Sequence, residues 1–536
     1  MQNCTQFLKE PKFRISSLLL SKKFSSFALV KLLLFMLEQL TPTLILSVII
    51  AYFLVLMGVS WWTGRHADNE DFFVAGRQSP WLLVAIGMIG ASLSGVTFIS
   101  IPGVVGAGKG NMNFSYMQMV LGYLAGYLVI GTVLLPLYYR LKLTSIYGYL
   151  GQRFGDVSYK TGAGYFLLSR VIGASFRLYL VAIVLDQFVL GVAPFNFPFW
   201  VTVSATILLI WVYTFKGGIK TIVWTDALQT ICMLAAVILT ISAIGTSMEK
   251  SIGDLFEIVR NSEYSKVFYF EGGWSDPNNF FKQFISGALI AVVMTGLDQD
   301  MMQKNLSCRS LGDAQKNMFT FSIILVFANL LFLTLGALLY LYAANIGLEI
   351  PAKSDQLFPT IALQYLSPAT GIVFVLGLIA AAYSSADSAL TALTTSFCVD
   401  FLGFEKSDKP EEEKKKTRFW VHVGFSVLLL FVILIFNALN DDAVINNVFK
   451  WAGLTYGPLL GLFSFGMLTN RRFKKEILVL VVCLATPILS YILDANNLFI
   501  NFKLGHTIIL LNGILTFVGL FLISEERPIE PENIYE

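Results

Sequence analysis

The stretch of this sequence that decides the fold is Ala380-Ala-Ala-Tyr-Ser-Ser-Ala-Asp-Ser-Ala-Leu-Thr391, set in an otherwise apolar run. With 3.6 residues per turn, Ser384, Ser388 and Thr391 share one face of a helix, and Asp387 lies beside them. A carboxylate inside a membrane span is costly unless it is paired, and it usually faces an aqueous path. The stretch therefore predicts a membrane protein with a polar cavity, where hydroxyl and carbonyl oxygens bind a hard monovalent cation.

The composition supports a membrane location. The chain has 536 residues, of which 56% are hydrophobic and only 14% charged, whereas a soluble protein is roughly a quarter charged. Helices are the expected conformation, because lipid offers the backbone no hydrogen-bond partners. We predict an all-α polytopic membrane protein with about 13 transmembrane helices. The predicted spans are 42–61, 80–107, 113–140, 158–190, 198–215, 219–248, 280–303, 315–346, 368–400, 418–437, 445–468, 475–493 and 505–523.

The connections between spans predict the orientation. Most of their Lys and Arg residues, Lys304 among them, fall in one set of alternate loops, which is the set expected in the cytoplasm. We therefore expect a multi-pass protein of the cell (inner) membrane with an extracytoplasmic N-terminus and a cytoplasmic C-terminus. Residues 249–279 form the longest outer loop, where we expect a short amphipathic helix. Residues 1–40 are interpreted as an N-terminal extension, either disordered or upstream of the true start, with an interfacial helix as the alternative.

Other chemistries find no support in the sequence. The five cysteines are scattered without a CxxC pair, the three histidines are isolated, and neither a catalytic triad nor a phosphate-binding loop is present. We therefore expect no enzyme activity and no organic cofactor. No basic stripe with interleaved aromatics indicates nucleic-acid binding.

The second span contains a candidate break. Gly87-Met-Ile-Gly-Ala-Ser-Leu-Ser-Gly-Val-Thr97 gathers three glycines and three hydroxyl residues near mid-span. Transporters bind ions and substrates where such helices open near the membrane centre. The alternative is a face of small residues for helix packing. We favour an opened helix.

Several further charges lie in or near spans. Arg170 and Arg177 are seven residues apart and so share a helix face. They are suited either to bidentate recognition of an anionic substrate or to salt bridges with Asp387 or Asp298. For Asp298 and Asp300, an ordinary cytoplasmic helix end and a binding role stay open.

Four motifs carry a resemblance to a known family. They are Asp71-Phe-Phe-Val-Ala-Gly-Arg77, Gly217-Gly-Ile-Lys-Thr-Ile-Val-Trp-Thr-Asp-Ala-Leu-Gln229, Ala381-Ala-Tyr-Ser-Ser385 and Asp313-Ala-Gln-Lys316. In this order they resemble the sodium/solute symporter family, which includes sodium–glucose and sialic acid transporters. The resemblance covers about residues 45–470.

The resemblance implies a leucine-transporter-type core of two inverted five-helix repeats that alternates its access around a central site. An extra N-terminal helix and loop would occupy residues 41–79. The two repeats would be residues 80–248 and 280–468. Two accessory helices (469–523) and a cytoplasmic tail (524–536) would follow.

The resemblance also implies site residues. The sodium site of the family maps onto the carbonyls of Gly90, Leu93 and Ala381 and the hydroxyls of Ser384 and Ser385. A second cation site would use the side chains of Asp226, Asp387 and Ser388. Solute contacts are expected from Ser94, Thr97, Arg170, Arg177, Thr295 and Asp298.

Three departures from the family pattern matter. Asp387 stands where relatives with two sodium ions have a serine, so it either strengthens a second cation site or titrates with a proton. The sugar-covering aromatics of glucose-type members are missing near Met294-Thr295-Gly296. The substrate arginine of sialic acid transporters would align near Gly173, so neither Arg170 nor Arg177 matches it.

The predicted function is sodium-coupled symport of a small polar organic solute, such as a sugar acid, a monocarboxylate or a sugar. The coupling ion would be Na+, and the partners are the solute and the lipid bilayer; the sequence predicts no particular oligomeric state. The alternatives are a proton-coupled symporter that uses Asp387 and a sensor or receptor with a transporter fold.

Overall fold

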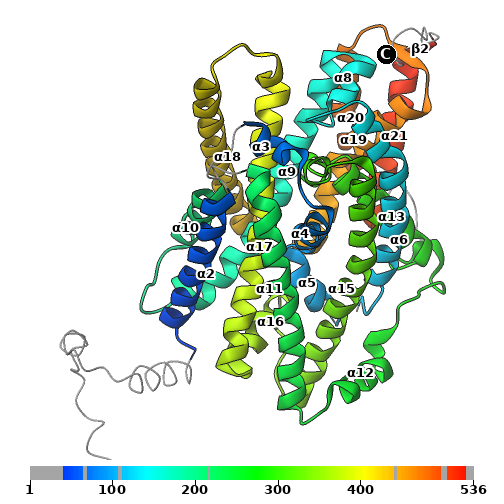
Figure 1. Cartoon of the computed structure of the whole chain (residues 1–536). Coiled ribbons are helices and arrows are strands. Elements are labelled where there is room, and N and C mark those ends of the chain that lie inside the picture. The colour runs from blue at the N-terminus through cyan, green and yellow to red at the C-terminus, as the bar shows by residue number, and fades with distance from the viewer. Residues whose placement is uncertain are drawn as a thin grey trace, which may run out of the picture.

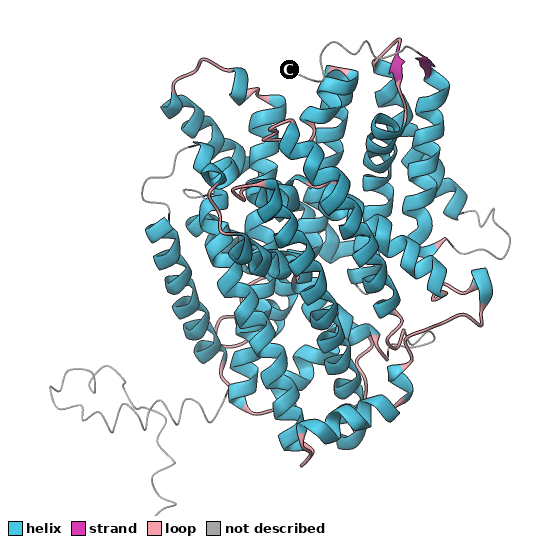
Figure 2. Ribbon diagram, turned by 45° about the vertical axis from the view of Figure 1, so that its right-hand side comes forward, coloured by secondary structure: helices cyan, strands magenta, loops and turns pink. Residues whose placement is uncertain are grey.

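The computed structural model describes residues 40–63, 69–106, 112–214, 218–439, 444–495 and 504–526. These residues form a bundle of helices (Figure 1). Two three-residue strands, β1 (Arg471–Phe473) and β2 (Ser524–Glu526), pair antiparallel at one end of the bundle (Figure 2). The predictions for residues 1–39, for Gly217 and for the tail from 527 onward lie outside the described residues.

Each predicted span coincides with a helix or with helical segments in sequence. Nine helices of the described residues are long and apolar enough to cross a membrane, and two bent pairs raise the number to eleven. The other two spans are α10, a shorter apolar helix, and α19. In chain order the helices are α2 (Pro42–Thr63), α4 (Trp81–Leu93) with α5 (Gly95–Val104), α6 (Tyr116–Val129) with α7 (Leu135–Arg140), α9 (Asp156–Leu185), α10 (Phe199–Thr214), α11 (Gly218–Ser247), α13 (Phe280–Ala291) with α14 (Gln299–Leu306), α15 (Leu311–Ile346), α17 (Pro368–Ser396), α18 (Glu411–Leu439), α19 (Val444–Leu468), α20 (Ile477–Ala495) and α21 (Ile508–Ile523).

Four short helices lie in the connections: α3 (Asn69–Val74), α8 (Gly148–Phe154), α12 (Ile252–Asn261) and α16 (Leu357–Thr360). The amphipathic helix expected in the long outer loop is α12, which buries Leu255 and Val259 and exposes Phe256. Ser251 and Asp254 form a reciprocal cap at its start. The hydrogen bonds from Ser251 lower the pKa of the Asp254 carboxyl.

The helices differ in how deeply they are buried. In Figure 1, α17, α11, α4 and α5 lie in the middle, with α2, α10 and α18 on one side and α6, α13 and α21 on the other. The most apolar window of α17 is 78% buried, against 17% for α18 and 22% for α20. The polar stretch from 380 to 391 therefore lies at the centre of the bundle, while α18 and α20 present apolar surface to lipid.

Small residues set the distance between α6 and α13. A Cβ placed on Gly122 would lie 2.1 Å from the carbonyl oxygen of Phe284, and one on Gly287 would lie 2.1 Å from that of Met119. Both obstacles are backbone atoms, which cannot rotate away. Glycine at these positions therefore lets the two helices approach closely, as in other membrane bundles.

Gly122→Ala is expected to lower the melting temperature of the purified protein by several degrees, because an overpacked contact costs about 1–3 kcal/mol. Thermal unfolding in detergent is the measurement. Gly58→Ala on α2 is the matched control, since nothing lies within 4 Å of a Cβ placed there. Equal melting temperatures for the two variants would contradict the packing described for α6 and α13.

Candidate functional site

The second span is broken at Ser94. Helix α4 ends at Leu93, Ser94 has non-helical dihedrals (φ 8°, ψ 173°), and α5 begins at Gly95. The two segments are bent by 52°. The predicted opening of this helix is therefore confirmed. Because the chain stops being helical here, the last carbonyls of α4 lose the amide donors that would lie four residues further on.

The glycines of α4 serve a different purpose from the break. A Cβ on Gly87 would lie 3.0 Å from the Cβ of Asp226, and one on Gly90 would lie 2.3 Å from Thr230 Oγ1 and 3.0 Å from Ser384 Oγ. The face of small residues for helix packing, which was the alternative to an opened helix, is therefore also present in α4. It places the end of α4 directly against α11 and α17.

Hydroxyl oxygens of α17 face this end of α4. Ser384 Oγ is buried and has no hydrogen-bond partner among the described residues. Ser385 Oγ lies 3.2 Å from the carbonyl oxygen of Ala91 and 3.4 Å from that of Ala381, to which it donates. A hydroxyl that donates its proton keeps lone pairs for a cation. This oxygen-only set suits sodium, and it brings together Gly90, Ala381, Ser384 and Ser385 of the predicted ligands.

Asp226 forms a buried ion pair with Lys304. Lys304 Nζ lies 2.7 Å from Asp226 Oδ2, and both side chains are at most 1% exposed. Lys304 was predicted in a cytoplasmic loop, and that prediction was wrong: it lies in α14, which folds back into the bundle after the seventh span breaks. Nothing in the local sequence marks this, because a lysine near the end of an apolar run also fits a loop.

The break in the seventh span lies at Leu297 and Asp298. The segment from Phe280 to Gly296 and helix α14 are bent by 64°. Asp298 caps α14 by accepting hydrogen bonds from the amides of Asp300 and Met301. Asp298 and Asp300 are both fully buried. The interpretation of these two residues as an ordinary cytoplasmic helix end is therefore wrong.

Arg170 is the ionic partner of both carboxylates. Its guanidinium contacts Asp300 and lies 3.7 Å from Asp298 Oδ2. Tyr456 donates a hydrogen bond to Asp298, and Ser388 Oγ lies 3.3 Å from Asp300 Oδ2. For Arg170 the sequence left open an anionic substrate or a salt bridge as its partner. The structure shows the salt bridge, with Asp298 and also with Asp300.

The three residues of the predicted second cation site have different partners. Asp226 pairs with Lys304, and Ser388 Oγ lies near Asp300. Asp387 accepts a hydrogen bond from the Ser388 amide and has Tyr52 of α2 as an electrostatic neighbour.

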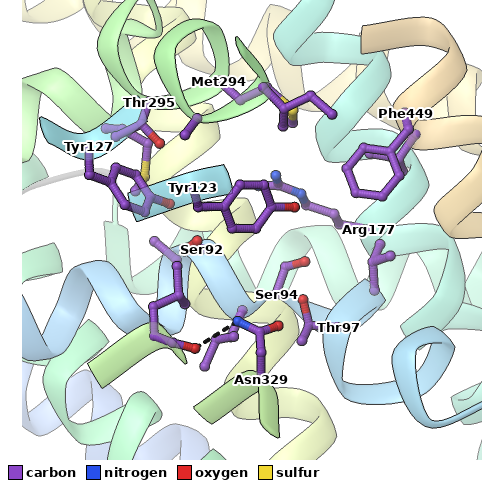
Figure 3. A pocket seen from close by; sticks show the side chains of 18 of the residues that line it. Ser92, Ser94, Thr97, Tyr123, Tyr127, Arg177, Met294, Thr295, Asn329 and Phe449 are labelled. Carbon is purple, nitrogen blue, oxygen red and sulfur yellow. Dashed lines mark hydrogen bonds between the residues drawn. The ribbon is translucent and has the colours of Figure 1, made fainter. Parts of the chain in front are cut away.

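A cavity of about 90 Å³ lies between the two breaks (Figure 3). Five of the six predicted solute residues line it: Ser94, Thr97, Arg170, Arg177 and Thr295. Asp298 is not among the lining residues and instead contacts Arg170 and Tyr456. Sequence reasoning missed Ser92, Tyr116, Tyr123, Tyr127, Asn329 and Phe449, which also line it. The spacing of the three tyrosines, seven and then four residues, places them on one helix face and was the available signal.

Arg177 stands out among these residues. Its side chain is 8% exposed, and it lines the cavity together with Tyr123 and Thr97 (Figure 3). In the part of the chain that the structure describes, it forms no ion pair. An unpaired guanidinium in a buried site is costly, so it favours an anion in the cavity.

Two broken helices that bring polar groups to the middle of a membrane bundle, around a small cavity, define a secondary transporter. The chain belongs to the sodium:solute symporter family, whose model matches residues 72–476. It is therefore a transporter rather than an enzyme, with sodium as the coupling ion.

Individual relatives are distant. The sodium/sialic acid symporter NanT of Aliivibrio fischeri is 24% identical over 483 residues, which is 87% of this chain and 91% of that protein. The human sodium-coupled monocarboxylate transporter 2 is 26% identical over 416 residues, 75% of this chain and 64% of that protein. The solved structure of a Na+-coupled sialic acid symporter in a substrate-bound outward-open state has a TM-score of 0.75 at 19% identity, covering 90% of this chain and 99% of that one. The predicted leucine-transporter-type fold is thereby confirmed.

Arg170→Gln is expected to destabilise the protein strongly, because removing one partner of a buried ion pair costs about 3–5 kcal/mol. A thermal melt of purified protein measures this, and Lys409→Gln is the control. Lys409 pairs with Glu413 on an exposed surface, where a pair contributes about 0–1 kcal/mol. Similar melting temperatures for the two variants would show that Arg170 is not the ionic partner of Asp298 and Asp300.

Proposed function

We propose that this transporter imports a small organic anion together with sodium, and that Arg177 binds the anionic group. The observation that carries the proposal is the unpaired guanidinium in the cavity between the two breaks. Arg170 already has two carboxylate partners, so Arg177 is the cation available to a solute. A guanidinium offers a carboxylate two parallel hydrogen bonds.

The cavity favours a monocarboxylate over a sugar acid. A volume of about 90 Å³ is small for a solute site, since ligand pockets commonly measure about 300–1,000 Å³. The hydroxyls of Ser94 and Thr97 would bind polar substituents, and Tyr123 and Tyr127 would cover the apolar part. The names of the sialic acid and monocarboxylate relatives both describe carboxylic acids, in agreement with an anionic solute.

Sodium would bind between α4 and α17. Its ligands would be the carbonyls of Gly90, Leu93 and Ala381 and the hydroxyls of Ser384 and Ser385. Ser385 contacts the Ala91 carbonyl, and Ala91, Leu93 and Ser94 also line the solute cavity. One broken segment would therefore serve both ligands. Either ligand would hold the break in the geometry that the other requires, which is a coupling free energy between them.

A single sodium ion would be carried in each cycle. A second sodium at Asp226 would have to displace the Lys304 ammonium 2.7 Å away or bind beside it against charge repulsion. Asp387 and Ser388 have other partners and would not complete such a site.

We also propose the orientation and the internal repeat. The two broken spans are the first spans of residues 80–248 and 280–468, as two repeats of one unit would require. The loops rich in Lys and Arg would face the cytoplasm, so that the N-terminus is outside and the C-terminus inside.

Ser384→Ala is expected to raise the sodium concentration for half-maximal uptake about tenfold, since a contact with an ion contributes ~1.4 kcal/mol or more. Uptake into proteoliposomes with sodium or choline outside is the measurement. Ser242→Ala, an exposed serine of α11, is the control for the same atomic change. An unchanged sodium dependence in Ser384→Ala would remove Ser384 from the ion site.

Arg177→Gln is expected to raise the concentration of solute at half-maximal uptake at least about thirtyfold, the factor that ~2 kcal/mol for a buried charge pair produces. A competition panel of lactate, pyruvate, a sugar acid and a neutral sugar identifies the solute class. Arg153→Gln is the control, because Arg153 donates to backbone carbonyls far from the cavity. Wild-type transport of a neutral sugar alone, or full transport by Arg177→Gln, would rule out the anion proposal.

A further inference from the structure

A second, larger cavity of about 660 Å³ lies on the outside of the bundle. Helices α9, α18, α19 and α20 form its walls, with Leu168, Phe176, Trp451, Leu484 and Ile488 among the lining side chains. This volume exceeds several-fold the ~150 Å³ that accepts a benzene ring. We call it the lateral groove.

The lateral groove faces the lipid. Leu168 is 50% exposed, Leu484 53% and Ile488 62%, and these side chains belong to helices that the composition places in the membrane. α18 and α20 are also the least buried spans. A groove of this kind inside a bilayer is filled by lipid rather than by water.

One charged side chain lines the groove. Among its described lining residues this is Lys450, which is exposed and lies 5.7 Å from the centre of the Tyr491 ring. Lys450 stands about two turns into α19, where an ammonium within a span needs an anionic or polar partner. Tyr491 and Trp451 are amphipathic rings of the kind found at the level of lipid headgroups.

We propose that the lateral groove is a binding site for an anionic phospholipid. An acyl chain would lie along Leu168, Leu484 and Ile488, and the phosphate would bind the Lys450 ammonium. Charge complementarity selects this occupant, because a zwitterionic headgroup carries its own cation and gains less from Lys450.

The position of the groove relates the lipid to the solute site. A cavity of about 10 Å³ lies between the two. It shares Phe176, Trp451 and Thr455 with the lateral groove and Arg170, Arg177, Met294 and Val448 with the solute cavity. Phe176 also stacks on Phe436 at 4.0 Å. A bound acyl chain would therefore pack against Phe176 and Trp451, which line the small cavity next to Arg177.

Quenching of tryptophan fluorescence by brominated acyl chains tests the site. The full-length protein is reconstituted with brominated phosphatidylglycerol or with brominated phosphatidylcholine of the same chains. The difference between wild type and Trp451→Phe isolates the signal of Trp451. We expect phosphatidylglycerol to quench this signal at a lower mole fraction than phosphatidylcholine does. Equal quenching by the two lipids in the wild type would overturn the proposal without the use of any charge variant.

Lys450→Gln identifies the headgroup contact. The preference for phosphatidylglycerol should fall about fivefold, which corresponds to ~1 kcal/mol for one basic residue near a membrane surface. Lys250→Gln removes the same charge from an exposed position outside the groove and should leave the preference unchanged. A preference that survives Lys450→Gln, or falls equally in Lys250→Gln, would exclude Lys450 as the phosphate ligand.

Discussion

The contact between the broken end of α4 and the serine face of α17 is the constraint on which the rest of the structure depends. Gly90 allows Ser384 and Thr230 to lie against the helix, and Ser94 ends the helix one turn later. The last carbonyls of α4, which lack amide partners, then lie close to the hydroxyls of Ser384 and Ser385, whose oxygens keep lone pairs for a cation. A continuous α4 would use its carbonyl oxygens in helical hydrogen bonds and leave only the hydroxyls of α17 for an ion. A larger residue at position 90 would separate the two helices.

Of the buried charged side chains around the site, Lys304 and Arg170 have carboxylate partners among the described residues, and Arg177 has none. Lys304 balances Asp226, and Arg170 lies between Asp298 and Asp300. Both pairs lie in or beside the second break, where Asp298 also caps α14. Arg177 is left without a carboxylate among the described residues, and it faces the cavity. The Lys304–Asp226 pair and the group of Arg170 with its two carboxylates therefore support the site, while Arg177 is the buried cation to which we assign the solute.

Much of this arrangement could be predicted from the sequence. Long apolar runs give the spans, because a bilayer imposes helices of a minimum length, and the cluster around Ser94 gives the first break. The second break could not be predicted, because Gly296 and Asp298 in a row of apolar residues also fit a helix end. Lys304 was misplaced for the same reason. Tyr123 and Tyr127 were missed because aromatic residues in a span are usually lipid-facing or core residues, and only the position of α6 against the cavity separates these roles.

Equilibrium binding of radioactive sodium to the purified chain, without any solute, is the most direct test of the ion site between α4 and α17. Saturable binding of one sodium ion per chain, displaced by unlabelled sodium but not by choline, is the expected result. The absence of saturable binding would contradict an ion site at this contact. Binding of two ions per chain would contradict the proposed single-ion stoichiometry.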